Sequence, residues 1–393
     1  LYNSSKKITN TVFFKSKRHE NYYSGGTMKK IFIFCTFIFT VLSITAYSCT
    51  GISIKTKDNK MIQARTIEFG EYNLNSRIVV SPRGKKFQSL TPSGKEDGYK
   101  WKSKYGFVGA SVVYDKFIGE GINEAGLNAG LFYFPHYGSL AKFNLKDKEN
   151  SIADMEVVGW ILSNFSTVEE VKKGLKKIKI VNIAYDEKGN PLPTAHWRIA
   201  DAKGNNIVLE IVNGGEVKIY ENKAGVVTNA PDYEWHIKNL NNYVNLYAGD
   251  AKSYERNGQK IFSFGSGTGA LGLPGDITPP SRFVRAFFYL NSSKIPENSY
   301  EGITQAFHIM NNFDIPIGIE YPLEHKDKIP KNLPSATQWT AVSNLSDREF
   351  YYTTMNNSQI RKIDLKKINF GTVKYKSVPM DKDDRQNIEE IKF

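Results

Sequence analysis

The sequence predicts a single domain of the α+β class, in which sheets bury their faces against helices. Two observations support this fold class. Segments in which apolar and polar residues alternate gather near the start, in the middle and at the end of the chain, and segments with the helical spacing of apolar residues lie between them. No linker, repeat or low-complexity tract divides residues 49–393, which are numerous enough for one large domain with a sizeable core.

The first predicted elements are strands. Residues 49–69 alternate between apolar and polar side chains on both sides of a polar Lys57-Asp58-Asn59 turn, which is the pattern of two strands. Residues 76–84 and 104–135 continue the sheet, and a glycine-containing hairpin turn at 123–126 divides the longer stretch. We therefore expect the first part of the domain to consist mainly of sheet.

Helices and further strands follow in turn. Residues 151–165 have helical apolar spacing, and residues 166–178 open with a capping box in which Ser166 is paired with Glu169. Residues 194–231 are expected to form a meander of strands broken by glycine-containing turns. Three helices and then three strands complete the expected elements: 231–243, 281–293 and 300–313, then 338–345, 349–356 and 359–365.

The residues before Cys49 have the layout of a secretory signal peptide. A basic start at Met28-Lys29-Lys30 precedes an apolar core, and the small residues Ala46 and Ser48 follow it. The apolar run is too short to favour a transmembrane helix, so we expect cleavage after Ser48, export to the periplasm or the medium, and no stable membrane insertion. Residues 28–48 would be the signal peptide and residues 49–393 the single domain, whereas residues 1–27 are expected to be upstream or added sequence outside the fold.

The charge pattern argues against a nucleic-acid partner. Removal of residues 1–48 takes away seven of the 53 basic residues and one of the 40 acidic residues, which lowers the formal net charge from +13 to +7. The lysines are scattered among acidic residues, singly or in pairs, without a basic helix or zinc-finger spacing. An exported enzyme with this mild excess could attract anionic substrates, but a solvated basic surface is the simpler explanation.

The cysteine count directs attention to Cys49. Cys35 lies in the predicted signal peptide, so Cys49 would be the one cysteine of the mature chain and also its first residue. An N-terminal cysteine can act as a nucleophile whose own α-amino group accepts or relays the thiol proton, and it then needs no histidine partner. The six histidines are isolated, without metal-site or papain-like spacing, so we expect neither a metal nor another cofactor.

Lipidation is the alternative interpretation of Cys49. Bacterial lipoproteins also begin with a cysteine after a signal peptide. Their signals usually carry leucine three residues before the cysteine and small residues between, whereas this chain has Ala46, Tyr47 and Ser48 there. The tyrosine fits poorly, so the nucleophile is the favoured reading. A lipid-anchored binding protein on the same fold remains the alternative from another functional class.

Seven segments, in order through nearly the whole chain after residue 48, resemble the choloylglycine hydrolase family, which includes penicillin V acylases and conjugated bile salt hydrolases. The resemblance implies the four-layer αββα sandwich of N-terminal nucleophile hydrolases and hydrolysis of a non-peptide C–N amide bond. The segments are Cys49-Thr50-Gly51, ARTIEFG (64–70), SPRG (81–84), GINEAGL (121–127), VVTNAPDYEWH (226–236), GTGALGLPGDITPPSRFVR (267–285) and TQAFHIMNNFDIPIG (304–318).

The resemblance implies roles for three residues around the thiol. Cys49 corresponds to the nucleophile that becomes acylated. Arg65 corresponds to an arginine beside that thiol, where a fixed positive charge would favour the thiolate. Glu68 stands where the family usually has aspartate, which accepts a hydrogen bond from the α-amino group. Because glutamate is one methylene longer, its reach or the local backbone must differ.

Three further residues are implied on the substrate side. Asn229 corresponds to the side-chain amide donor of the oxyanion hole, although it could also cap the following helix. Arg282 corresponds to the remaining active-site arginine, whereas Arg285 is expected to be an ordinary helix residue. Tyr133 corresponds to a substrate-binding position with tyrosine in penicillin V acylases and asparagine in bile salt hydrolases. Its backbone amide would be the second oxyanion donor.

The sequence therefore predicts an exported cysteine amidase of the penicillin V acylase type, acting on a small amide with a hydrophobic acyl group. Bile salt hydrolase and acyl-homoserine lactone acylase are the alternatives within the fold. The resemblance also implies a homotetramer, in support of which the segment GSGTGALGLPGD (265–276) lies within a long excursion of the chain.

Overall fold

The computed structural model describes residues 47–70, 73–186, 189–192, 194–319, 336–383, 385–386 and 388–393. The predictions made for residues 1–46 lie outside this part of the chain. Within it, no helix is both long and apolar enough to cross a membrane.

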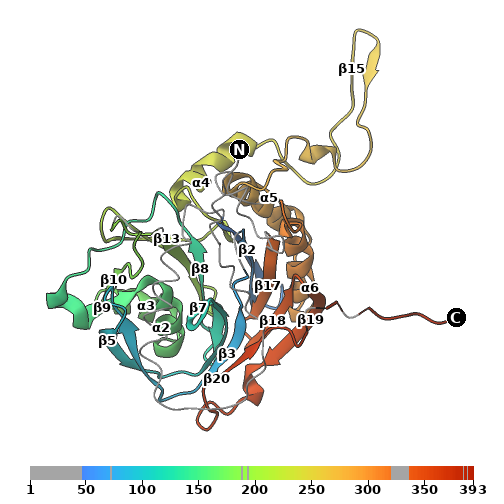
Figure 1. Ribbon diagram of the computed structural model, residues 1–393. Helices are drawn as coiled ribbons and strands as arrows, with labels where there is room; N and C mark the ends of the chain where they lie inside the picture. The colour runs from blue at the N-terminus through green and yellow to red at the C-terminus, as the bar shows by residue number, and fades with distance from the viewer. Residues whose placement is uncertain are drawn as a thin grey trace, which may run out of the picture.

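Two large antiparallel sheets form the centre of the molecule (Figure 1). The first has six strands in the order β14-β1-β2-β17-β18-β19, and the second has eight in the order β13-β12-β11-β8-β7-β6-β3-β20. The strands of the first sheet are β1 (Tyr47–Lys55), β2 (Met61–Phe69), β14 (Val226–Val227), β17 (Ala336–Asn344), β18 (Glu349–Thr354) and β19 (Asn357–Asp364). Those of the second are β3 (Arg77–Ser81), β6 (Phe107–Val112), β7 (Tyr114–Asn123), β8 (Asn128–Tyr133), β11 (Ala195–Ala200), β12 (Asn206–Val212), β13 (Glu216–Glu221) and β20 (Lys376–Pro379).

Helices cover the outer faces of both sheets (Figure 1). Helices α5 (Pro279–Ser292) and α6 (Ser299–Met310) pack on the six-stranded sheet, and α2 (Val157–Asn164) and α3 (Val168–Leu175) pack on the eight-stranded one. The layers therefore run helix, sheet, sheet, helix, and the predicted α+β sandwich is confirmed. Strand β2 lies in the middle of its sheet, covered on both faces, and all nine of its residues are buried.

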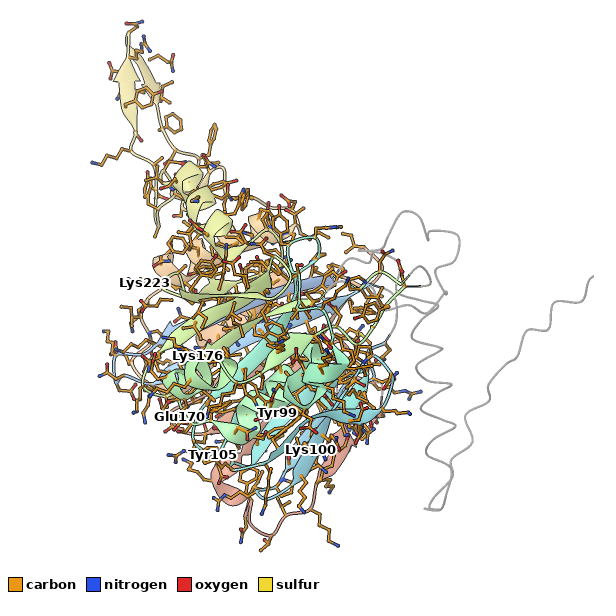
Figure 2. The ribbon with its side chains drawn as sticks, turned by 90° about the vertical axis from the view of Figure 1, so that its left-hand side faces the viewer. Tyr99, Lys100, Tyr105, Glu170, Lys176 and Lys223 are labelled. Carbon is orange, nitrogen blue, oxygen red and sulfur yellow. The ribbon has the colours of Figure 1, made fainter. Side chains whose placement is uncertain are left out.

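The described part of the chain also contains smaller elements. Helix α4 (Tyr233–Asn239) is the next element after β14, and the short segment between them connects the edge strand of a sheet to a helix. Three two-stranded pairs lie outside the large sheets: β4 (Lys86–Leu90) with β5 (Glu96–Lys102), β9 (Ser151–Ala153) with β10 (Lys179–Val181), and β15 (Tyr254–Arg256) with β16 (Gln259–Ile261). The last pair is the tip of an arm, residues 244–278, that projects from the body (Figures 1 and 2).

Two local predictions were wrong. The helix expected over 151–165 begins only at Val157, because residues 151–153 instead pair with β10. The predicted capping box is displaced by one residue. Thr167, not Ser166, caps α3 and accepts a hydrogen bond from the N–H of Glu170, whose carboxylate in turn accepts from the backbone and hydroxyl of Ser166. The sequence offers adjacent Ser-Thr and Glu-Glu pairs, so spacing alone does not select the register.

Candidate active site

The candidate site lies where β1 begins and where the neighbouring strands β2 and β14 end. Cys49 pairs with Ile67 of β2, and on its other side β1 pairs with β14, whose next residues lead to Asn229. Only 3% of Cys49 is exposed. Two residues further on, Gly51 has no room for a side chain, because an added Cβ would lie 2.7 Å from the ring of Phe132 and 2.8 Å from Nη1 of Arg198.

Arg65 provides a buried positive charge beside the thiol. Its Nη2 lies 2.9 Å from Sγ of Cys49 and donates to it. Nη1 donates to the carbonyl oxygens of Gly119 at 3.0 Å and Leu131 at 2.6 Å, both in the opposite sheet. The guanidinium also stacks on Phe132, with Cζ 4.4 Å from the ring centroid. These bonds fix the orientation of the guanidinium, so its positive charge stays next to the sulfur of Cys49.

Asn229 joins the nitrogen of Cys49 to the opposite sheet. Its Oδ1 accepts a hydrogen bond from the N–H of Cys49 at 2.8 Å, and its Nδ2 donates to the carbonyl oxygen of Tyr133 at 2.9 Å. The side chain is therefore oriented by partners on both sides. The amide group of Asn229 has two N–H bonds, of which one donates to the carbonyl oxygen of Tyr133. The second could donate to another acceptor.

Arg282 reaches the same cluster from helix α5. Its Nη2 donates to Oδ1 of Asn229 at 2.7 Å, and its Nη1 donates to the carbonyl oxygen of Cys49 at 2.5 Å and to Oγ1 of Thr50 at 2.9 Å. The side chain is fully buried. Arg285, expected to be an ordinary helix residue, donates to the carbonyl oxygens of Pro274 and Asp276 and so anchors the base of the arm.

The structure also brings Glu68 and Tyr133 to this cluster. Glu68 is buried and is the cross-strand partner of Ser48, and its Oε1 accepts from the hydroxyl of Thr337 at 3.3 Å. Tyr133 ends β8 with a half-buried side chain, and its backbone N–H faces the sulfur of Cys49. All six residues predicted for the site are therefore near the thiol. Phe132 and Phe134 are fully buried and belong to the core, so they do not line a cleft.

Opposing effects act on the thiol. Burial raises the pKa of Cys49 above its ordinary value, and the nearby carboxylate of Glu68 raises it further. The positive charges of Arg65 and Arg282 and the N–H of Tyr133 lower the pKa of Cys49, but burial outweighs them. Burial is thus the largest of the effects on the pKa of Cys49.

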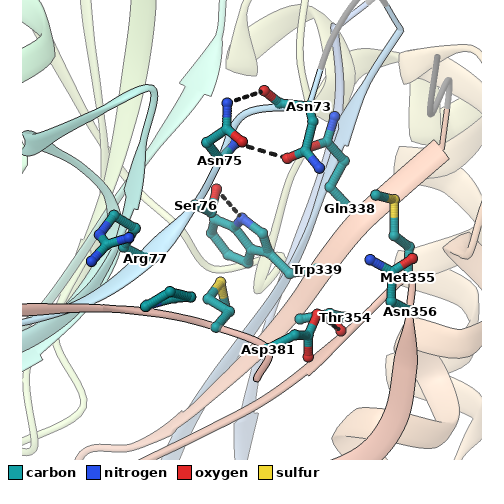
Figure 3. A pocket seen from close by; sticks show the side chains of 12 residues that line it. Asn73, Asn75, Ser76, Arg77, Gln338, Trp339, Thr354, Met355, Asn356 and Asp381 are labelled. Atoms are coloured by element: carbon teal, nitrogen blue, oxygen red, sulfur yellow. Dashed lines mark hydrogen bonds between the residues drawn. The ribbon is translucent and has the colours of Figure 1, made fainter. Parts of the chain in front are cut away.

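A cavity of about 220 Å³ is lined by residues at the start of β3 and by residues of β17, β18 and β20 (Figure 3). Trp339 of β17 separates it from the cluster, because its ring lies 5.3 Å from Cζ of Arg65 while its indole N–H donates to Ser76. The lining is mostly polar, and Trp339 is its one aromatic residue among those described. The other lining residues are Asn73, Asn75, Ser76, Arg77, Gln338, Thr354, Met355, Asn356, Pro379, Met380 and Asp381.

Sequence reasoning missed two buried histidines next to Asn229. His196 of β11 approaches the carbonyl oxygen of Thr228, and His236 of α4 approaches that of Asn229. Isolated histidines carry no spacing signal, so only the fold could reveal them. In the part of the chain that the structure describes, no group of three His, Cys, Asp or Glu side chains could hold a metal ion.

The αββα sandwich, with this cluster at the end of its first strand, defines the N-terminal nucleophile hydrolase class of folds. The chain belongs to the linear amide C–N hydrolases of the choloylglycine hydrolase family, whose family model matches residues 49–386. It is therefore a hydrolase of linear amides that acts on small molecules.

This chain is similar to proteins named bile salt hydrolase and to a protein named penicillin V acylase. The bile salt hydrolase/transferase of Clostridium perfringens (strain 13 / Type A) is 35% identical over 323 residues, which cover 82% of this chain and 93% of that protein. The penicillin V acylase of Pectobacterium atrosepticum is 26% identical over 332 residues, which cover 79% and 78%.

Solved structures give the same result for the fold. A mutant of the conjugated bile acid hydrolase from Clostridium perfringens superposes with a TM-score of 0.74 at 31% identity, and the match covers 88% of this chain and 100% of the other. The penicillin V acylase from Agrobacterium tumefaciens has a TM-score of 0.63 at 24% identity, covers 82% of this chain and 88% of its own, and supports the fold alone.

Proposed function

We propose that this protein is an exported amidase in which the thiol of Cys49 attacks the carbonyl carbon of a linear amide. The observation that carries the proposal is the approach of Arg65 Nη2 to within 2.9 Å of Cys49 Sγ, among groups able to bind an oxyanion. The thiol proton passes through the α-amine to the leaving nitrogen, so the amine product departs and an acyl-enzyme thioester remains. Water then hydrolyses the thioester and releases the carboxylic acid and the free thiol.

The other residues have roles that follow from their contacts. The amide of Asn229 and the backbone N–H of Tyr133 would donate to the negative oxygen of the tetrahedral intermediate; loss of one such donor typically costs about 3 to 4 kcal/mol of transition-state stabilisation. Arg282 fixes Asn229 and the carbonyl oxygen of Cys49. Glu68 would orient the α-amine from the neighbouring strand position. Two solved relatives support the pairing of cysteine and arginine, because they carry substitutions of a cysteine and an arginine sixteen positions apart, the separation of Cys49 and Arg65.

Removal of the residues before Cys49 would activate the site. Cleavage converts the amide nitrogen of Cys49 into an α-amine, which can keep the bond to Asn229, and it uncovers the thiol whose burial raises its pKa. The family match begins at Cys49, which supports this boundary. The intact mass of secreted protein should correspond to residues 49–393 with a free amine. A diacylglycerol adduct on the thiol would contradict the amidase mechanism and favour the lipid-anchored alternative.

Penicillin V is the substrate that Tyr133 favours. A phenol at this position takes room that a bulky steroid would need, and it offers a flat face to the phenoxyacetyl group, worth about 0.5 to 1.5 kcal/mol for an offset aromatic pair. Conjugated bile salts are the second candidate, because relatives named for bile salt hydrolysis reach 35% identity, above the 26% of the penicillin V acylase.

Relative kcat/KM values test the substrate directly. Penicillin V, glycine- and taurine-conjugated bile salts and long-chain acyl-homoserine lactones should be compared on the mature wild type and on Tyr133→Asn. The substitution is expected to lower activity on penicillin V more than activity on bile salts. If the kcat/KM of the wild type is about tenfold higher for conjugated bile salts than for penicillin V, the protein is a bile salt hydrolase instead.

A tetramer is proposed for the mature protein, with the arm as its contact. The arm carries apolar side chains that solvent would otherwise surround: Val244 is 88% exposed, Phe264 97% and Leu271 71%. Exposed apolar groups along a projecting segment favour contact with a second copy. Light scattering after gel filtration should give a tetrameric mass that falls in Phe262→Ser/Phe264→Ser. A monomeric wild type at micromolar concentration would contradict this proposal.

A further inference from the structure

The segment that carries Asn229 belongs neither to a sheet nor to a helix. It runs from the end of β14 at Val227 to the start of α4 at Tyr233, and Pro231 within it has no N–H. Its buried backbone groups therefore need partners from elsewhere, since an unpaired buried carbonyl or N–H is costly. Three buried side chains outside the catalytic cluster provide those partners.

Two histidines hold the carbonyl groups on either side of the Asn229 side chain. His196 Nε2 lies 2.9 Å from the carbonyl oxygen of Thr228, and His236 Nε2 lies 3.0 Å from that of Asn229. A carbonyl oxygen only accepts, so both Nε2 atoms carry hydrogen. Burial lowers the pKa of His236 to about 4, which leaves its ring neutral near pH 7 with its single N–H on that carbonyl.

Glu210 contacts both His196 and the first residue of α4. Its Oε1 lies 3.3 Å from Nδ1 of His196 and also accepts the N–H of Tyr233, the first residue of α4, at 2.8 Å. Because Nε2 of His196 already carries hydrogen, the contact between Nδ1 and Oε1 requires one more proton, on the ring or on the carboxyl group. Glu210 and His196 are both buried, so their contact is shielded from water.

Ring stacking restricts both histidines to these directions. The ring of His196 lies parallel to Phe134 with centroids 4.4 Å apart, and that of His236 lies parallel to Phe283 with centroids 4.6 Å apart. Neither ring can rotate without breaking a stack. The position of the Asn229 backbone is thus fixed by a rigid frame built from β11, β12 and α4.

We propose that Glu210, His196 and His236 are positioning residues that hold Asn229 in register with Cys49. This inference rests on the proposed role of Asn229 as an oxyanion donor. Such a donor must lie within a few tenths of an ångström of its place, and a misplacement of 1 Å can cost about 100-fold in rate. Loss of the frame should lower kcat and kcat/KM equally and leave KM unchanged, because the affected interaction forms only in the transition state.

Two substitutions of His196 separate positioning from packing. The amide nitrogen of glutamine can occupy the place of Nε2, so His196→Gln keeps the donor to Thr228. The shorter His196→Asn can replace only Nδ1 and leaves the Thr228 carbonyl without a donor. We expect kcat within about threefold of the wild type for His196→Gln and a loss of about ten- to 100-fold for His196→Asn, with KM unchanged in both. Equal kcat values in the two variants, or a loss confined to KM, would overturn the proposal.

Glu210→Gln tests the same frame should His196→Asn fail to fold. Oε1 of Glu210 contacts both the N–H of Tyr233 and Nδ1 of His196. A glutamine has one group at this position, which cannot both accept from Tyr233 and donate to Nδ1 of a neutral His196. A loss of kcat of about three- to tenfold is expected. Glu156→Gln is the matched control, because Glu156 is also buried but accepts from Ser89 and from the N–H of Leu90, far from Asn229 along the fold. Wild-type kcat in Glu210→Gln would count against the proposal.

A measurement without substrate keeps this test separate from the proposed function. Asn229 Oδ1 holds the nitrogen of Cys49, so a shift of Asn229 should change the rate at which iodoacetamide alkylates the Cys49 thiol of the mature chain. His196→Asn is expected to change that rate at least about twofold and His196→Gln to leave it unchanged. Should the wild type hydrolyse no amide, the proposed function fails, yet unchanged alkylation in both variants would still refute the positioning role.

Discussion

Asp154 allows a quantitative prediction about pH and stability. Its carboxylate is buried beneath the loop that precedes β11, where Oδ2 accepts from the hydroxyl of Thr194 at 2.9 Å and Oδ1 from the N–H of Met155 at 3.0 Å. Burial raises the pKa of Asp154 from 3.8 to about 6. Since one pKa unit corresponds to about 1.4 kcal/mol, ionisation of this group lowers the free energy of unfolding by roughly 3 kcal/mol.

The sign of the effect follows from proton binding. Between pH 3.8 and about 6 the folded state binds more protons at Asp154 than the unfolded state does, so this contribution to stability falls as pH rises and stays lost above pH 6. Asp154→Asn removes the charge and keeps the oxygen that accepts from Met155. Relative to the wild type, the variant should gain roughly 2.4 kcal/mol between pH 4 and pH 7.5, because part of the effect is already present at pH 4.

Urea unfolding at these two pH values, followed by tryptophan fluorescence, measures this gain. Asp347→Asn serves as the control: burial would raise the pKa of Asp347, but hydrogen bonds from Ser299, Asn344 and Lys60 lower it to about 2. Its titration window, from about 2 to 3.8, lies below both measurements, so its effect on stability should be nearly equal at the two pH values. A difference between Asp154→Asn and wild type that does not grow from pH 4 to pH 7.5 would refute this account of the buried carboxylate.

Three predictions concern the site and its support. Cys49→Ser should fold like the wild type but lose on the order of 10³-fold or more in kcat, because a hydroxyl is a far poorer nucleophile, and retained turnover would identify another nucleophile. Glu68→Gln should lower kcat about tenfold while Glu68→Asp keeps part of the activity, and equal activity in the two would mean that the charge does not orient the amine. Gly51→Ala should lower stability by about 1 to 3 kcal/mol, measured by urea unfolding, because its Cβ would overlap the ring of Phe132; an unchanged midpoint would show that the ring can move.

Sequence patterns predicted the strands of the site well, but they predicted the contacts between its side chains less well. The strands expected from the alternation in residues 49–69 and from residues 338–345 were found there, although β2 and β17 are buried along their whole length. Family resemblance identified Cys49, Arg65 and Asn229, whose proximity depends on pairing between distant strands. The bond from Asn229 to the Cys49 nitrogen, and the histidines behind it, could not be predicted, because they depend on side-chain directions that only the packed sandwich defines. Short pairs such as β9 with β10 were missed for a different reason, because strands of three residues carry too little periodicity.

The order of strands in the six-stranded sheet has a consequence for synthesis on the ribosome. Arg65 lies in β2, between β1 from the beginning of the fold and β17 from near its end, with Ala341 as its partner in β17. A nascent chain that has emerged as far as Arg282 already contains every residue of the catalytic cluster, yet one edge of β2 is still unpaired and Trp339 does not yet cover the guanidinium. Pairings over such sequence distances form late and slowly. The surroundings of the proposed nucleophile are therefore completed only after β17 has been translated, so copies truncated before β17 would lack this support for Arg65.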